Sequence, residues 1–276
     1  MKNIIVAEAQ GFCWGVRRAL DIVEEHGPTS ILGDLIHNKQ VVAQLEAKGK
    51  KVIHEIREDE TNPVVITAHG TDIKNFEQLN NLGKEIVDTT CPLVSKIYEE
   101  GHRLEALGYH ILIIGDKNHV EVKGIASRMN QPIVVNDETE LDAVKLPPRV
   151  GVISQSTYNP QKFDKLVELI QKKGVELEAC NTICAPTKKR QIAAEQLAKE
   201  VDMMLVVGGF HSSNTKKLHE MAQHYVESHH IETPDHIQEE WLVGKDDIGI
   251  IAGASTADWI IEDVCQRIRE LCPEEA

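Results

Sequence analysis

Short apolar runs alternate along the chain with longer segments in which apolar residues recur every three to four positions. The runs include VVIT at 64–67 and MMLVV at 203–207, and the longer segments include 39–49, 95–108 and 215–226. Runs of this length are typical of buried strands, whereas a spacing of three to four predicts amphipathic helices. Strands that alternate with helices predict parallel sheets covered by helices, which is an α/β fold.

The alternation passes through the same three kinds of turn in each third of the chain. A cysteine turn comes first, and two polar turns follow, each after a short apolar run. The cysteine turns carry Cys13, Cys91 and Cys184. The polar turns carry His37 and His69 in the first third, His119, Glu121, Ser156 and Thr157 in the second, and Ser212, Ser213, Asn214 and Ser255 in the last. A repeat of roughly 90 residues predicts three small α/β units, approximately 1–91, 92–180 and 181–276, whose loops face a central cavity.

The three cysteines each lie where an apolar run gives way to a helical pattern. A helix start offers free N–H groups and the positive end of the helix dipole, which favour the metal-binding thiolate. No CxxC pair occurs, which argues against a zinc ribbon, and three distant thiols leave a fourth ligand position open. Zinc and an iron–sulfur cluster both suit these ligands, and three buried, unreactive cysteines are the simpler alternative. Cys265 and Cys272 share a C-terminal helical pattern and are interpreted as packing residues.

Composition narrows the classes of function. The chain has 276 residues, with 30 Lys and Arg against 44 Asp and Glu, a formal net charge of −14. This balance argues against general binding to nucleic acid or to anionic membranes. The N-terminus lacks a secretory signal and no stretch is long enough to span a membrane, so we expect a cytoplasmic protein. Six cysteines in a reducing compartment favour metal binding or catalysis over disulfides.

The polar turns together predict a site for an anion. Three imidazoles, several hydroxyls, one amide and the N–H groups of helix starts are suited to phosphate. Each element alone has a simpler explanation, such as a helix cap or a tight turn. Glu121 follows His119 by two residues and is a candidate proton donor if burial keeps it protonated, whereas a surface carboxylate is the alternative.

Motifs in all thirds of the chain resemble one family. AEAQGFCWGVRRAL, LIHN, TAHG, DTTCPLV, GDKNHVEVKG, SQST, NTICAPTKKRQ, GGFHSSNT and AGASTADW occur in this order. They look like the 4-hydroxy-3-methylbut-2-enyl diphosphate reductases of the methylerythritol phosphate route to isoprenoids, over essentially the whole chain. The resemblance implies a trefoil of three α/β domains around a 4Fe-4S cluster with one open iron, held by Cys13, Cys91 and Cys184.

The resemblance also implies roles for the polar turns and a reaction. Seven residues would bind the substrate diphosphate: His37, His69, His119, Ser212, Ser213, Asn214 and Ser255. Glu121 would relay protons, helped by Ser156 or Thr157. The reaction would reductively remove the allylic hydroxyl of 4-hydroxy-3-methylbut-2-enyl diphosphate, giving isopentenyl and dimethylallyl diphosphate.

Electrons would have to come from a partner, because no flavin or nicotinamide fingerprint occurs in the sequence. Ferredoxin or flavodoxin is the expected donor. Basic residues just beyond two cysteine turns are candidates for docking such an acidic carrier, and a solvated helix face is the alternative. These residues are Arg17, Arg18, Lys188, Lys189 and Arg190.

The sequence departs from the family pattern at three places. Val120 replaces the proline of an HPE motif, and Ser156 stands where a threonine is usual. Phe210 and His211 occupy positions where a polar pair is expected. None of these changes removes an implied ligand or acid.

Other classes of protein remain open at this point. A dehydratase of the quinolinate synthase type also uses three cysteines, but it would need arginines to bind its acidic substrate. A non-catalytic iron–sulfur redox sensor would need a basic DNA-binding or partner-binding module. A mononuclear zinc hydrolase is the third alternative.

Overall fold

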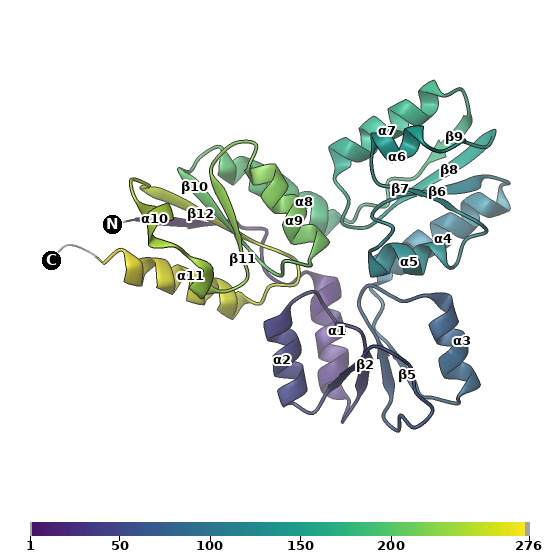
Figure 1. The fold of residues 1–276 in the computed structure, drawn as a ribbon, viewed down its shortest axis with the longest axis horizontal. Coiled ribbons are helices and arrows are strands. Elements are labelled where there is room, and N and C mark those ends of the chain that lie inside the picture. The colour runs from purple at the N-terminus through teal and green to yellow at the C-terminus, as the bar shows by residue number, and fades with distance from the viewer. Residues whose placement is uncertain (1, 274–276) are drawn as a thin grey trace. The chain divides into compact units, whose positions relative to one another are not determined.

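The computed structural model describes residues 2–273, and within them three sheets form, each of four parallel strands (Figure 1). The strands are β1 (Asn3–Val6), β2 (Ser30–Leu32), β3 (Lys51–Ile53), β4 (Val64–Ile66), β5 (Ile86–Asp88), β6 (His110–Ile114), β7 (Ile133–Val135), β8 (Arg149–Ser154), β9 (Glu176–Ala179), β10 (Met203–Val207), β11 (Ser228–Ile231) and β12 (Asp247–Ala252). The α/β class with parallel sheets is confirmed.

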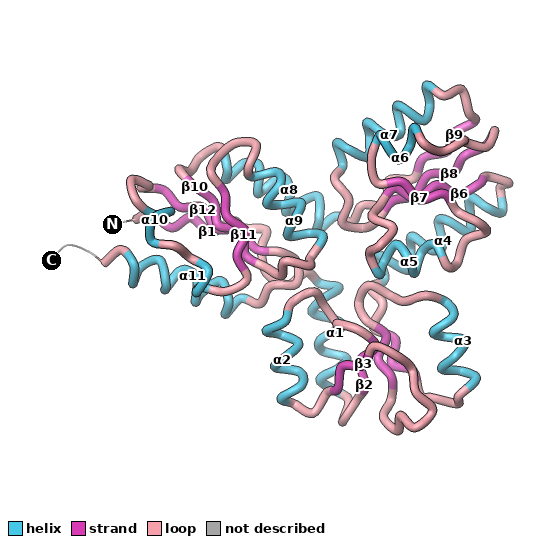
Figure 2. Tube along the Cα trace, viewed as in Figure 1, coloured by secondary structure: helices cyan, strands magenta, loops and turns pink. Residues whose placement is uncertain are grey.

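Helices separate most consecutive strands, as Figure 2 shows in cyan and magenta. They are α1 (Trp14–Glu25), α2 (Lys39–Ala47), α3 (Ile73–Asn81), α4 (Pro92–Ala106), α5 (Val120–Ala126), α6 (Glu138–Asp142), α7 (Pro160–Lys172), α8 (Ala185–Ala198), α9 (Ser213–Ala222), the 3-10 helix η1 (Pro234–His236), α10 (Glu239–Leu242) and α11 (Asp258–Leu271). A parallel pair of strands needs a crossover connection, and these helices provide it.

All three sheets follow one plan. Their strand orders are β5-β4-β2-β3, β9-β8-β6-β7 and β1-β12-β10-β11, which we call the first, second and third sheets. In each, the strand that leads to a cysteine lies at one edge. The next two strands lead to the second and first polar turns, respectively. The repetition seen in the sequence is therefore also a repetition of strand positions.

The third sheet is completed by the very first strand of the chain. β1 pairs with β12, with Asn3 opposite Asp247 and Val6 opposite Ile250. The strand before Cys13 thus belongs to the sheet of the last third, so the three sheets do not coincide with uninterrupted segments of sequence. The proposed division at 91 and 180 stays a prediction.

The chain falls into two compact units. The first comprises the N-terminal segment through Val16, the short stretch His37–Val41 and the described residues from Ala185 onward. The second comprises Arg17–Ile36 and Val42–Cys184 and includes the first and second sheets.

The two inner strands of the second sheet, β6 and β8, are largely apolar and almost wholly buried. Along β6, Leu112 and Ile114 belong to a core that includes Phe163 of α7. The alternate residues, Ile111 and Ile113, belong to a separate core on the α4 and α5 side (Figure 1). Because successive side chains point to opposite faces, strands covered by helices on both faces are apolar along most of their length.

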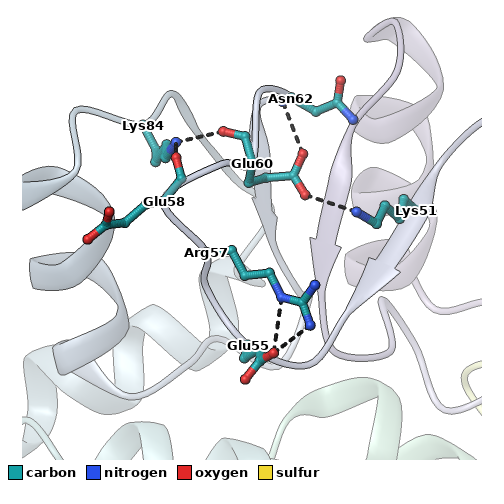
Figure 3. A network of polar contacts seen from close by, with 7 residues as sticks. All are labelled: Lys51, Glu55, Arg57, Glu58, Glu60, Asn62 and Lys84. Atoms are coloured by element: carbon teal, nitrogen blue, oxygen red, sulfur yellow. Dashed lines mark hydrogen bonds and ion pairs between the residues drawn. The ribbon is translucent and has the colours of Figure 1, made fainter.

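Polar contacts hold the long connection between β3 and β4 against the first sheet (Figure 3). Glu60 pairs with Lys51 at 3.4 Å and accepts the N–H of Asn62 at 3.1 Å. Lys84 donates to the carbonyls of Glu58 and Glu60, both at 2.6 Å. Lys84 lies two residues before β5, whereas Cys91 follows the other end of that strand.

No helix within residues 2–273 combines the length and apolar character needed to cross a membrane.

Candidate functional site

The three cysteine turns are fixed by the same hydrogen bond. The N–H of Cys13 donates to the carbonyl of Ala254 at 3.1 Å. The N–H of Cys91 donates to Ala68, and that of Cys184 donates to Ser156, both at 3.0 Å. Each acceptor lies two residues beyond the end of the neighbouring strand, β12, β4 or β8. Each thiol therefore has the same position relative to its own sheet, beside the second polar turn of that sheet.

This bond also reveals which polar residues correspond to one another. The residues directly after the three acceptors are His69, Thr157 and Ser255. In each case the following residue donates its N–H back to the first residue of the turn, at 2.9 to 3.0 Å. Thr157, rather than Ser156, is thus the counterpart of His69 and Ser255, a match that the motif alignment in the sequence did not reveal.

Glu121 and Ser156 form a buried pair in the second unit. Glu121 is 1% exposed and accepts both the N–H of Ser156, at 2.6 Å, and its hydroxyl, at 2.8 Å. The carbonyl of Ser156 accepts the N–H of Cys184, so one residue connects the carboxyl group to a cysteine turn. Hydrogen bonds of this kind to a carboxylate are among the stronger ones in proteins. The alternative of a surface carboxylate at Glu121 is therefore wrong.

Two of the predicted imidazoles lie together next to this pair. His119 caps α5 and accepts the N–H of Glu121 at its Nδ1, at 3.2 Å. That bond leaves its Nε2 as the nitrogen that carries the proton of the neutral ring. The rings of His69 and His119 meet edge to face with centroids 5.6 Å apart. The second unit thus gathers His69, His119, Glu121 and Ser156 from two sheets.

Arg128 joins the two elements that carry these groups. One of its guanidinium nitrogens donates to the carbonyls of Thr71 and Gly124, each at 2.7 Å. The guanidinium also lies 4.2 Å from the ring centroid of Tyr98, an attractive cation–π geometry. Burial raises the pKa of Tyr98 to about 12, with Arg128 opposing the rise and Glu121 adding to it. Neither residue carries a periodic or motif signal in the sequence, and both were missed there.

The first unit gathers a second set of predicted residues. Ser212 caps α9 and accepts the N–H of Thr215 at 3.3 Å. Ser255 donates its hydroxyl to the carbonyl of His37 at 3.3 Å. A Cβ on Gly209 would collide with the same carbonyl, so only glycine allows this approach. Three loops that are distant in sequence thus converge at His37, Ser212 and Ser255.

Asn214 stands out in this group. It is 4% exposed, yet neither its amide nitrogen nor its amide oxygen has a hydrogen-bond partner among the described residues. The hydroxyl of Thr215, the next residue, lacks one as well. Buried polar groups in native proteins are nearly always satisfied, so this amide at a helix start is a candidate ligand-binding group. Ser213 precedes it in the first turn of the helix and is half-buried.

The remaining cysteines lie in different settings. The Sγ of Cys180 accepts from Arg103 at 3.3 Å, and burial raises the pKa of this thiol although Arg103 opposes the rise. Cys265 is buried in α11, where burial likewise raises the pKa of its thiol, and Cys272 caps that helix. Among residues 2–273, no group of three or more His, Cys, Asp or Glu side chains is arranged to hold a metal ion. Cys13 belongs to the first unit and Cys91 and Cys184 to the second.

The prediction that Arg190 helps to dock an electron carrier is wrong. Arg190 is 5% exposed and donates to the carbonyls of Gly11 and Pro186, at 2.6 and 3.2 Å. The buried guanidinium therefore stabilises the loop before Cys13, and a partner protein cannot reach it. Arg17 and Lys189 are exposed, as is Trp14 beside Cys13.

Comparisons with known proteins agree with the sequence motifs. A family model described as LytB protein matches residues 4–269. The chain is similar to the 4-hydroxy-3-methylbut-2-enyl diphosphate reductase of Caldanaerobacter subterraneus subsp. tengcongensis, with 40% identity over 284 residues that cover 99% of each protein. It is also similar to the reductase of the same name from Campylobacter lari, with 40% identity covering 97% of this chain and 98% of that one.

Two solved structures resemble the chain as well. One, of an (E)-4-hydroxy-3-methyl-but-2-enyl diphosphate reductase, is 37% identical, with a TM-score of 0.70 and coverage of 98% of this chain and all of that one. Another, of the E-1-hydroxy-2-methyl-but-2-enyl-4-diphosphate reductase from Plasmodium falciparum, is 26% identical, with a TM-score of 0.91 and coverage of 97% and 88%. The match to the family model, the full-length relatives and these structures show that the chain belongs to the LytB family.

Proposed function

We propose that the chain uses two electrons and two protons to remove the allylic hydroxyl of 4-hydroxy-3-methylbut-2-enyl diphosphate as water, giving isopentenyl and dimethylallyl diphosphate. The observation that carries this proposal is the position of Ser156. Its hydroxyl and N–H donate to the buried Glu121, and its carbonyl accepts the N–H of Cys184. In this proposal Glu121 would hold a proton beside a cysteine turn, and a reductive dehydroxylation requires such a group. The names of the relatives support the same substrate.

Cys13, Cys91 and Cys184 would hold a 4Fe-4S cluster in this proposal. Three thiols at equivalent strand ends, each fixed by the same main-chain hydrogen bond, form a soft set of ligands that fits iron–sulfur chemistry. The cluster would supply electrons and an open iron that acts as a Lewis acid toward the substrate hydroxyl. Cys180, which is held by Arg103, would take no part.

The polar turns would bind the diphosphate. Among the described residues the buried amide of Asn214 has no partner, and it lies in the first turn of α9, the end of a helix that favours anions. The hydroxyls of Ser212, Ser213 and Ser255 and the imidazoles of His37, His69 and His119 would add donors. Binding at the diphosphate would orient the reacting carbons, which is how binding energy away from the reacting bond promotes catalysis.

Glu121 would hold the proton that the leaving hydroxyl needs. The hydroxyl of Ser156 already lies in hydrogen-bond contact with its carboxyl oxygen, at 2.8 Å, and provides a path for that proton. Thr157, the counterpart of His69 and Ser255, would place a second hydroxyl at the same edge. Burial of the pair would keep bulk water from competing for the proton.

Electrons would come from a small acidic carrier such as ferredoxin or flavodoxin. The exposed Trp14 beside Cys13 and the exposed charges of Arg17 and Lys189 are the residues that support docking near a cysteine turn.

An anaerobic assay with reduced carrier and 4-hydroxy-3-methylbut-2-enyl diphosphate tests the function, with both five-carbon diphosphates as products. Cys184→Ser should lose most of the bound iron and sulfide together with activity, because it removes a proposed ligand. Cys180→Ser is the matched control, since it removes a thiol four residues away and should leave both unchanged. Equal iron and sulfide content in the two variants would contradict the ligand assignment, and absence of both products would contradict the function.

A further inference from the structure

Glu232, at the end of the edge strand β11, contacts the turn that leads to Ser212 and Asn214. Its carboxylate accepts the N–H of Phe210 at 2.6 Å. Its carbonyl accepts the side-chain amide of Gln40 at 3.2 Å. One residue therefore touches both the 208–212 turn and the stretch that follows His37.

The turn that Glu232 holds is tightly constrained from several sides. His230, two residues earlier on β11, contacts the carbonyl of Gly208 through its Nε2 at 2.9 Å. Burial is the main cause that lowers the pKa of His230, which favours the neutral ring. Gly209 lies against the carbonyl of His37, where no larger residue fits. Side chains therefore contact the main chain of the turn at two points, the carbonyl of Gly208 and the N–H of Phe210, and Glu232 is the one that holds the second.

The negative charge of Glu232 helps to explain what its hydrogen bond to the N–H of Phe210 does for the site. A carboxylate close to a bound diphosphate repels it, and the repulsion is weakly screened at a half-buried site. A residue that contributed only charge would therefore weaken the binding of this anion. The benefit of Glu232 must instead come from the hydrogen bond, because that bond holds the turn in the shape that presents Ser212 and Asn214.

We infer that Glu232 is a positioning residue for the diphosphate site, acting through the N–H of Phe210 and without contact to the substrate. This inference rests on the proposed function, since it assigns a role within the same site. It predicts that the acceptor oxygen matters and that the negative charge does not.

Inorganic pyrophosphate is the probe, titrated by calorimetry into the anaerobically prepared holoenzyme. Glu232→Ala removes the acceptor and should weaken pyrophosphate binding about tenfold, which is near the upper end of the effect of losing one neutral hydrogen bond. Glu232→Gln keeps an acceptor oxygen but removes the charge, so its affinity should equal or exceed that of the unaltered protein. In the assay, Glu232→Ala should raise KM while leaving kcat within about twofold, as loss of uniform binding does.

Glu232→Asp supplies a further test if the alanine variant does not fold. It retains the charge and shortens the reach, so it should weaken pyrophosphate binding although the chemistry of the group is unchanged. Glu227→Gln is the control for charge, because Glu227 lies just before β11 and pairs with Lys245 at 2.8 Å on the exposed surface.

Three results would overturn the inference. If Glu232→Ala binds pyrophosphate like the unaltered protein, the contact has no positioning role. If Glu232→Gln binds as weakly as Glu232→Ala, the charge is what matters and the argument from the acceptor fails. If the unaltered protein does not bind pyrophosphate at all, the diphosphate site of the proposed function fails, and the inference falls with it.

Discussion

Glu121 and Asn214 hold the same position on two different helices. Each is the second residue of a helix that follows the first polar turn of its sheet, after the caps His119 and Ser212. Glu121 is fully engaged by Ser156, whereas the amide of Asn214 has no partner among the described residues. The same helix position therefore carries a carboxyl group held by two hydrogen bonds in one sheet and an amide without a partner among the described residues in another. In the proposed function, the first would hold a proton and the second would bind the diphosphate.

Replacing Glu121 by Gln should lower kcat by about 100-fold or more, because the amide cannot donate the carboxyl proton as a general acid. The amide oxygen can still accept the N–H of Ser156, so we expect the fold, the iron content and pyrophosphate binding to persist. Steady-state kinetics under anaerobic conditions, with iron analysis of the same preparation, measure this. A kcat equal to that of the unaltered enzyme would remove Glu121 from the proton path.

Replacing Asn214 by Leu should separate stability from function. The native amide is buried and has no partner among residues 2–273, so an apolar side chain of similar size should leave Tm unchanged or raise it. Pyrophosphate affinity should fall about tenfold, because the ligand loses a hydrogen-bonding group. Thermal unfolding and calorimetry on one preparation give both quantities. A lower Tm with unchanged affinity would show that Asn214 is structural.

The helix α5 illustrates how an element can retain its role although its sequence departs from the family pattern. Val120 is its first residue, where the resemblance implied proline. The residue before it, His119, has φ −72° and ψ 139°, the extended conformation that a residue preceding proline prefers. The same chain places Pro92 directly after Cys91 at the start of α4. The position is therefore already shaped for proline.

Val120→Pro should stabilise the protein by about 0.4–1 kcal/mol, because proline at the first helical position restricts the unfolded chain without straining the fold. The contacts of His119 and Glu121 should be preserved, so kcat should remain close to its original value. Ile125→Pro is the destabilising control, since Ile125 lies beyond the first turn of the helix and is buried. Chemical unfolding measures both variants, and a loss of stability for Val120→Pro would refute the account of this turn.

The sequence was sufficient for some elements and insufficient for others, for identifiable reasons. The polar turns and their cysteines could be found because each follows an apolar strand in the same order. The pairing of β1 with β12 could not, since it depends on contacts between the two ends of the chain that leave no local pattern. Arg128 and Glu232 were missed because their roles arise from main-chain groups of distant turns, which side-chain spacing does not reveal.

The net charge of the whole molecule does not favour an anionic substrate, so binding must depend on groups close to the site. A chain with a formal net charge of −14 repels an anionic substrate at long range. The proposed diphosphate site therefore depends on close donors, namely N–H groups, hydroxyls and amides, rather than on an extended basic surface. Arg190 follows the same principle, because its guanidinium donates to loop carbonyls and is not exposed to solvent.

The pairing of β1 with β12 has a consequence for biosynthesis. A ribosome releases Asn3 long before Asp247, so the opening strand must wait, unpaired, until nearly the entire polypeptide has been made. The turn at Cys13 takes its shape from Ala254 and shares this delay, whereas Cys91 and Cys184 depend on partners made earlier. Insertion of an inorganic cofactor that requires all three thiols would then be postponed until translation ends, so a truncated product would never carry it.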